Sequence, residues 1–118
     1  MNKVKIIFGF EQDLTGNRIR AEVYGPALND ILRAATDRFH GATLTVTSGM
    51  VLKGEHYVKE QAAIMEAYSD LSLDDAKEAA REMAQGIAQG LRQSKVLVSV
   101  EAASAEFIQN SMVQTRKR

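Results

Sequence analysis

Hydrophobic and polar residues alternate in three stretches of this chain, residues 3–10, 43–52 and 95–101. This period-2 pattern is typical of half-buried strands. A fourth stretch, residues 55–68, is apolar on both sides, which favours a strand covered on both faces, although its middle also suits a helix. The sequence therefore predicts four strands, with a bulge or bend at Gly49 in the second.

Two further stretches repeat their apolar residues at intervals of three and four, the period of an amphipathic helix. The first is predicted to begin at Pro26, because proline suits the first helical position, and to end at Gly41. The second is predicted to begin at Ser72, whose side chain can cap free amides of the first turn, and to run to about Arg92. Residues 18–24 are predicted to be a short edge strand or an extended loop.

The order strand, helix, strand, strand, helix, strand predicts an α+β fold of the ferredoxin-like split βαβ type (β-α-β-β-α-β). Two helices then lie on one face of a four-stranded antiparallel sheet. Residues 1–103 are expected to form a single α+β domain, and residues 104–118 a C-terminal tail that orders at a subunit interface. The other face of the sheet stays open unless a partner subunit or the tail covers it, so we expect a homo-oligomer with composite pockets.

Charge and composition exclude several classes of protein. The chain has 118 residues, of which 15 are basic and 15 acidic, so no net field draws it onto duplex nucleic acid or an anionic membrane. It has no cysteine, which excludes disulfides, thiolate nucleophiles and cysteine-ligated zinc. No apolar run approaches the roughly 20 residues that span a bilayer. We expect a soluble, cytoplasmic protein.

Candidate chemistry in the sequence is sparse. His40 and His56 are the only histidines, and neither has a cysteine or a paired acid at ligand spacing, so no metal site is predicted. Glu11 and Asp13 sit in turn sequence without a nearby histidine, which does not favour acid–base chemistry. The glycines do not form a phosphate-binding loop. From these observations we expect no catalytic residue and no cofactor.

Several basic residues could form an anion-binding site. The same residues could equally be ordinary solvent-exposed charges on the surface. Guanidinium groups fork onto phosphates, and two subunits could bring such groups together. The phosphate candidates are Arg18, Arg20, Arg92, Arg116 and Arg118. His56, beside Lys53 and Tyr57 at the hairpin turn, is a further anion candidate, and Gln109 is a polar candidate from the tail.

Five segments of the chain resemble small phage proteins, among them the Thoeris anti-defence sponge family. They carry turn and strand patterns rather than ligand signatures. These segments are residues 7–10, 13–17, 38–46, 49–55 and 93–98.

The resemblance implies a non-enzymatic, oligomeric binding protein in the cytoplasm of a bacterial host. It implies sequestration of a cyclic nucleotide immune signal, of the cyclic ADP-ribose type or a cyclic oligonucleotide, by a dimer-based homo-oligomer with a hexamer as one form. Such a ligand needs arginines for its phosphates and a flat apolar surface for its adenine. The base-packing candidates are Phe10, Tyr24, Met50 and Tyr57.

Two other functions remain open from the sequence. A small enzyme of the dimeric α+β barrel type shares the same order of elements and often uses an apolar cavity with few polar groups. A protein-interaction inhibitor of a bacterial defence complex, including a CRISPR effector, needs only an exposed sheet edge and a flexible tail.

Overall fold

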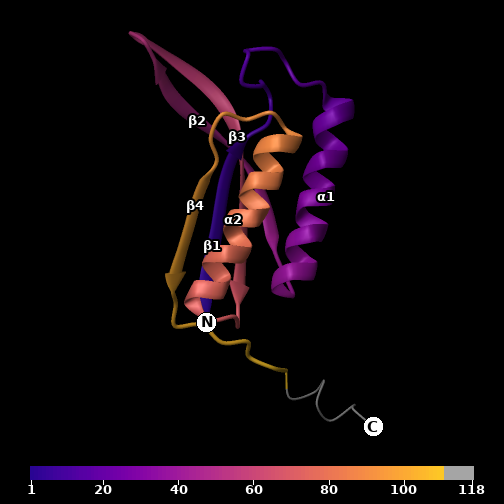
Figure 1. The fold of residues 1–118 in the computed structure, drawn as a ribbon, viewed down its shortest axis with the longest axis vertical. Coiled ribbons are helices and arrows are strands. Elements are labelled where there is room, and N and C mark those ends of the chain that lie inside the picture. The colour runs from indigo at the N-terminus through magenta and orange to yellow at the C-terminus, as the bar shows by residue number, and fades with distance from the viewer. Residues whose placement is uncertain (111–118) are drawn as a thin grey trace.

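The structure is a computed structural model, and it describes residues 1–110. Its elements follow the predicted order. They are β1 (Asn2–Gly9), α1 (Ala21–Phe39), β2 (Thr43–Lys53), β3 (His56–Ser69), α2 (Leu73–Gly90) and β4 (Leu97–Ala102). The strands form one antiparallel sheet in the order β2-β3-β1-β4, and both helices lie against the same face of it (Figure 1). The prediction of a ferredoxin-like α+β fold is confirmed.

The alternation along β1 decides which face is the core. Val4, Ile6 and Phe8 are buried beneath the helices, whereas Lys3 and Lys5 point to the face without helices. Helix α2 covers β1 and β4 largely with alanine, so its backbone can lie close to the sheet. The apolar contacts of the core are therefore concentrated on one side, and we refer to the other side as the open face.

Helix α1 begins at Ala21, before the predicted start at Pro26, so the prediction of a strand or loop over residues 18–24 is wrong for most of that segment. Arg20 is extended, and its carbonyl accepts hydrogen bonds from the amides of the first turn. The Tyr24 ring packs on Phe10 with a centroid distance of 4.9 Å. We attribute the early start to this tertiary contact, which compensates for the amide that Pro26 lacks inside the helix.

Strands β2 and β3 pair without interruption, from Thr43 opposite Glu66 to Lys53 opposite His56. The predicted bulge at Gly49 is therefore absent. Strand β1 pairs with β3 only as far as Gly9. Beyond that point the hairpin continues as a two-stranded ribbon, residues 48–61, which projects from the body of the protein (Figure 1). We call this ribbon the arm.

Helix α2 begins as predicted. The Ser72 side chain accepts a hydrogen bond from the Asp75 amide at 3.1 Å, and Asp74 and Asp75 both lie in the first turn. The helix ends at Gly90, and Arg92 takes a left-handed conformation with φ 51°. The capping signal at the start was thus a more accurate guide than the fading apolar pattern at the end.

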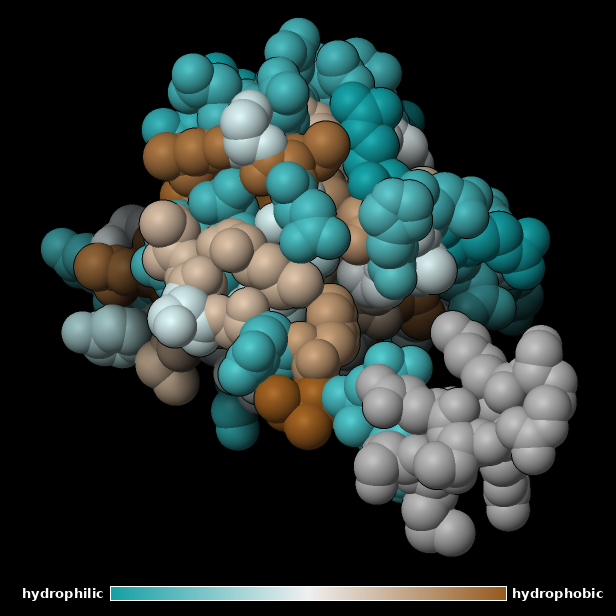
Figure 2. All heavy atoms as spheres, turned by 90° about the horizontal axis from the view of Figure 1, so that it is seen from below, coloured by the Kyte–Doolittle hydropathy of each residue, from teal (hydrophilic) through white to brown (hydrophobic). Residues whose placement is uncertain are grey.

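At the end of the molecule opposite the arm, the surface is mixed. Figure 2 shows hydrophobic side chains between hydrophilic ones there, and Leu71 and Leu73 at the start of α2 are partly exposed. Residues 103–110 follow β4 without regular structure. Arg116 and Arg118 lie outside the described residues. Neither helix of the described chain is long and apolar enough to cross a membrane.

Candidate functional site

A cleft of about 1070 Å³ opens where β1 ends and the arm departs from the sheet. Three segments form its walls: residues 10–18 after β1, parts of both strands of the arm, and residues 93–97 between α2 and β4. Ile7 and Leu97, which are paired across β1 and β4, form an apolar floor on the open face. The cleft therefore brings together residues that are far apart in the sequence.

Two of these walls are bonded to each other. The Leu14 amide donates to the Arg92 carbonyl at 2.7 Å. The Gln93 side-chain amide donates to the carbonyls of Gln12 at 2.8 Å and Leu91 at 2.9 Å. The loop after β1 and the loop before β4 are thus held as one unit.

Gly9 makes room for this connection. A Cβ atom at position 9 would lie 3.0 Å from the Oε1 atom of Gln93, which is tighter than most real contacts. The glycine lets the Gln93 side chain cross the end of β1 and reach the loop beyond it.

Asp13 shapes the loop after β1. Its Oδ1 accepts hydrogen bonds from the Thr15 hydroxyl at 2.6 Å, the Thr15 amide at 2.9 Å and the Asn17 amide at 3.0 Å. The Thr15 hydroxyl, the two amides and the nearby Arg92 charge together hold the pKa of Asp13 below its ordinary value of 3.8, although desolvation partly opposes them. Asp13 is therefore an ionised structural acceptor.

The Glu11 side chain binds a backbone amide of β3 just beyond the point where the backbone pairing of β1 with β3 ends. Its Oε1 accepts a hydrogen bond from the Gln61 amide at 3.0 Å, one residue before the last pair between β3 and β1. Glu11 is partly buried and lines the cleft. Within residues 1–110 its second carboxylate oxygen accepts no hydrogen bond, so one oxygen is fixed and the other is available.

The remaining charges of the cleft are mostly basic. Lys53 is paired with Glu60 across the arm at 2.8 Å. Arg18, Lys59 and Lys95 also line the cleft. The site thus combines both signs of charge with an apolar floor, which suits a small ligand that has a zwitterionic part and an apolar part. Within residues 1–110, no three His, Asp or Glu side chains gather closely enough to hold a metal ion.

Three of the predicted ligand-binding residues lie at this cleft. Arg18 and Lys53 line its rim and are exposed. Phe10 also borders it, but only 2% of this residue is exposed, and its ring packs against Tyr24 at 60°. Phe10 and Tyr24 thus form an aromatic pair that joins α1 to the cleft wall, with little free ring surface at Phe10.

The predicted residues of the arm lie on its two faces. Leu52 pairs directly with Tyr57, so these side chains share a face with Met50, and Met50 and Tyr57 are 63% and 74% exposed. The next pair, Lys53 and His56, lies on the opposite face.

The other predicted residues are dispersed. Arg20 occupies the N-cap position of α1 without a side-chain capping bond, and its Nε lies 3.8 Å from Oε2 of Glu22, with both side chains exposed. The Arg92 side chain is exposed at the loop before β4, and Gln109 belongs to the segment after β4. Within the described part of one chain, the structure brings together only a minority of the predicted set.

Sequence reasoning missed the residues that build the cleft. Glu11 was considered only as a partner of Asp13, and each of these carboxylates is bound to backbone amides instead. Gln93 gave no signal, because its role depends on the distant Gly9. The Asp13-Leu14-Thr15 turn was the one local feature that could have pointed to a structured loop here.

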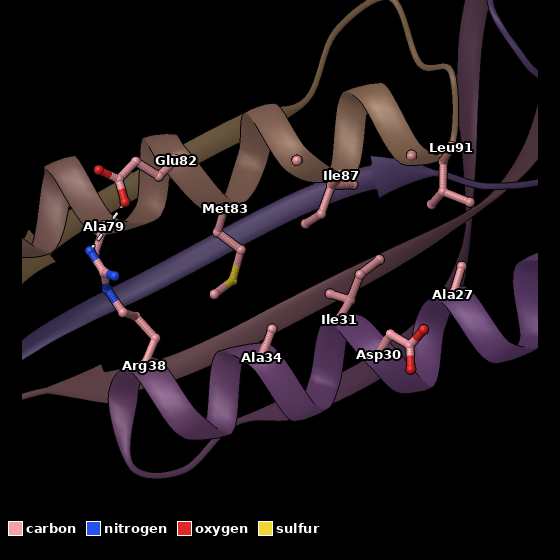
Figure 3. A pocket seen from close by; sticks show the side chains of 12 residues that line it. Ala27, Asp30, Ile31, Ala34, Arg38, Ala79, Glu82, Met83, Ile87 and Leu91 are labelled. Atoms are coloured by element: carbon pink, nitrogen blue, oxygen red, sulfur yellow. Dashed lines mark hydrogen bonds and ion pairs between the residues drawn. The ribbon is translucent and has the colours of Figure 1, made fainter.

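A second cavity, a groove of about 510 Å³, lies between α1 and α2 (Figure 3). Small alanine and glycine residues leave space between the helices unfilled, and the side chains of Ile31, Met83 and Ile87 lie along it. Arg38 and Glu82 form an ion pair of 3.2 Å at one end. The groove offers few polar groups, so the cleft is the better candidate for chemistry.

Comparison with known proteins shows the fold but no sequence family. No protein-family model and no curated protein sequence matches this chain. Among solved structures, it is similar to a phage SAM lyase in complex with S-methyl-5'-thioadenosine, with 13% identity over 85% of this chain and 79% of that chain and a TM-score of 0.65. The phage SAM lyase in its apo state has 15% identity over 92% of both chains and a TM-score of 0.62.

A third similar structure is the divalent cation tolerance protein Cut A1 from Thermus thermophilus. It has 8% identity over 98% of this chain and 93% of that chain, with a TM-score of 0.54. At these identities the likeness establishes the shared fold alone.

The comparison corrects one prediction. We expected the chain not to be an enzyme, and this is contradicted by the similarity over most of the chain to a lyase, which is an enzyme. The resemblance to the sponge family is not tested by any of these matches and stays a prediction. What the chain has in common with the lyase and the cation tolerance protein is the course of the backbone.

Proposed function

We propose that this chain is an enzyme that cleaves S-adenosylmethionine and releases S-methyl-5'-thioadenosine. The observation that carries the proposal is the similarity to the phage SAM lyase over 85% to 92% of the chain. The mixed charge and apolar floor of the cleft support it, because the substrate joins an adenosine to a charged amino acid through a sulfonium.

The chemistry fits a site without a paired acid and base. Attack by the substrate's own carboxylate on its Cγ atom forms a C–O bond and breaks the Cγ–S bond, and the bonding electrons pass to sulfur. The products are homoserine lactone and S-methyl-5'-thioadenosine, and no water, proton or cofactor is consumed. A protein accelerates such a reaction mainly by holding the substrate in the folded conformation that closes the ring.

The residues of the cleft suit the parts of this substrate. The apolar floor at Ile7 and Leu97 suits the adenosine. The cations at the rim, among them Arg18 and Lys95, suit the carboxylate. The bonded loops at Leu14 and Gln93 provide a firm wall against which the substrate can be positioned.

We further propose that the protein works as a homo-oligomer in the cytoplasm of a bacterial host. Leu97 on the open face is 61% exposed, and Leu52 and Tyr57 on the arm are 61% and 74% exposed. A two-stranded ribbon is marginally stable alone in water, so an arm that packs on a neighbouring copy would be stabilised. The floor of the cleft lies on the open face, and a neighbour there would complete the cleft.

The test is incubation of the purified protein with S-adenosylmethionine, followed by mass spectrometry of the products. We expect S-methyl-5'-thioadenosine and homoserine lactone in equal amounts, and no cleavage of S-adenosylhomocysteine, which lacks the sulfonium. Recovery of intact S-adenosylmethionine would refute the proposal. A parallel incubation with cyclic ADP-ribose distinguishes sequestration, in which intact ligand stays bound until the protein is denatured.

A further inference from the structure

We propose that Glu11 is the residue by which the cleft distinguishes a positively charged sulfonium substrate from neutral thioether compounds. This inference rests on the proposed function. The carboxylate of Glu11, which follows the end of β1, would then discriminate between charged and neutral ligands.

Glu11 is already held in place before any ligand binds. The 3.0 Å hydrogen bond from the Gln61 amide fixes one oxygen, and the side chain is partly buried. Ordering a side chain on binding costs conformational entropy, and this cost is reduced for a carboxylate that is fixed beforehand. Its second oxygen accepts no hydrogen bond within the described residues.

The other two acids of the cleft are engaged elsewhere. Asp13 accepts three hydrogen bonds from Thr15 and Asn17 in its own loop. Glu60 forms its 2.8 Å ion pair with Lys53. Among the cleft acids of the described chain, the charges of Asp13 and Glu60 thus each have a cation nearby, Arg92 and Lys53, whereas Glu11 forms no ion pair and its charge can meet a cationic ligand.

The expected kinetic effect follows from the charge of each species. Sulfur is positive in the substrate, loses its charge as the Cγ–S bond breaks, and is neutral in the released thioether. A carboxylate beside sulfur therefore stabilises the bound substrate more than the transition state, and it does not retain the product. Glu11 should strengthen substrate binding without retaining the product and without raising kcat.

The variant for the test is Glu11→Gln. Its amide oxygen can still accept the hydrogen bond from the Gln61 amide, so the wall of the cleft is preserved while the charge is lost. We expect dissociation constants for S-adenosylmethionine to rise about tenfold, between the effects of exposed and buried charge pairs. The constant for S-adenosylhomocysteine should change by less than about twofold, since that ligand has no charge at sulfur.

Sinefungin separates charge from sulfur chemistry, because it carries an ammonium group in place of the sulfonium. Isothermal titration of the three ligands to wild type, Glu11→Gln and the control Glu22→Gln, an exposed acid of α1 outside the cleft, should show weaker binding of both cationic ligands only for Glu11→Gln. In turnover, Glu11→Gln should raise KM and leave kcat unchanged or higher.

Equal weakening of all three ligands, or no weakening of any, would overturn this inference and leave the proposed function intact. A wild-type protein that binds none of the three would overturn the proposed function itself. Matching thermal unfolding curves for wild type and both variants establish that the comparison is made between folded proteins.

Discussion

Asp13 illustrates how a single carboxylate is committed to structure rather than chemistry. Its lowered pKa has the Thr15 hydroxyl as its largest cause, and the same bonds fix the turn that forms one wall of the cleft. A carboxyl group with a lowered pKa in the folded state contributes stability above its unfolded pKa and loses that contribution as the pH falls. The turn should therefore lose this stabilisation as the pH falls through the folded pKa of Asp13.

We predict that Asp13→Asn removes part of the acid dependence of stability. The variant should unfold more readily than wild type at pH 7, and the difference should shrink as the pH falls from the ordinary value of 3.8 through the lower folded pKa. Urea unfolding at pH 7 and at about pH 3 measures this. An equal difference at both pH values would contradict the prediction.

We also predict that Thr15→Val raises the pKa of Asp13 toward its ordinary value. The substitution removes the hydroxyl donor at 2.6 Å while keeping the Thr15 amide. NMR titration of the Asp13 carboxyl group in both proteins measures the change. An unaltered titration would show that the backbone amides and Arg92 dominate instead.

Residues of this kind set the limit of prediction from sequence. The turn around Asp13 is local, so its residue types indicated it. Glu11 and Gln93 act on partners far along the chain, the Gln61 amide and the Gln12 carbonyl, and no local pattern reports such contacts. The candidate site was therefore mostly missed, although two of the cations named from the sequence, Arg18 and Lys53, do line the cleft.

At the scale of elements, α2 was predicted well because its signals are local. Ser72 caps it, and its apolar stripe faces the sheet. The start of α1 was mispredicted, because the Phe10–Tyr24 contact that supports the first turn is tertiary. Helix starts are thus predictable where the capping residue itself carries the signal.

We predict that Ser72→Ala lowers the free energy of unfolding by about 1 kcal/mol, since the Asp75 amide loses its acceptor. Urea unfolding measures the change. Ser72→Asp is the matched control, because its carboxylate retains the cap and is favoured at a helix N-terminus. Equal losses in both variants would contradict a capping role.

We predict that Gly86→Ala raises the free energy of unfolding by about 0.5–1 kcal/mol. Gly86 lies inside α2, and a Cβ there would meet no atom within 4 Å. Gly54→Ala is the contrasting variant, because Gly54 has φ 63° at the turn of the arm and should lose stability. Stabilisation by both, or by neither, would contradict this account.

At the scale of the whole molecule, the order of elements was sufficient to predict the fold, since few topologies place two helices on one face of such a sheet. The cleft was not predictable in the same way. It is assembled from β1, the arm and the loop before β4, which meet only after the sheet has formed. The arm itself follows from β2 and β3 being longer than β1.

We predict that Leu52→Glu shifts the protein from an oligomer toward a smaller species, because Leu52 is 61% exposed on the apolar face of the arm. Size-exclusion chromatography with light scattering measures the mass across a range of concentrations. Val23→Glu, at a residue 55% exposed on α1, is the control and should leave the mass unchanged. A monomeric wild-type protein would contradict the proposed assembly.

The crossing of Gly9 by the Gln93 side chain also constrains how such sequences can diverge. A Cβ at position 9 would lie 3.0 Å from Oε1 of Gln93, so an alanine there would require the Gln93 side chain to shift. A homologue with alanine at position 9 should carry a shorter side chain at position 93, and one that keeps a long side chain there should keep the glycine. Covariation of this pair would identify distant homologues that retain the cleft even after most other residues have changed.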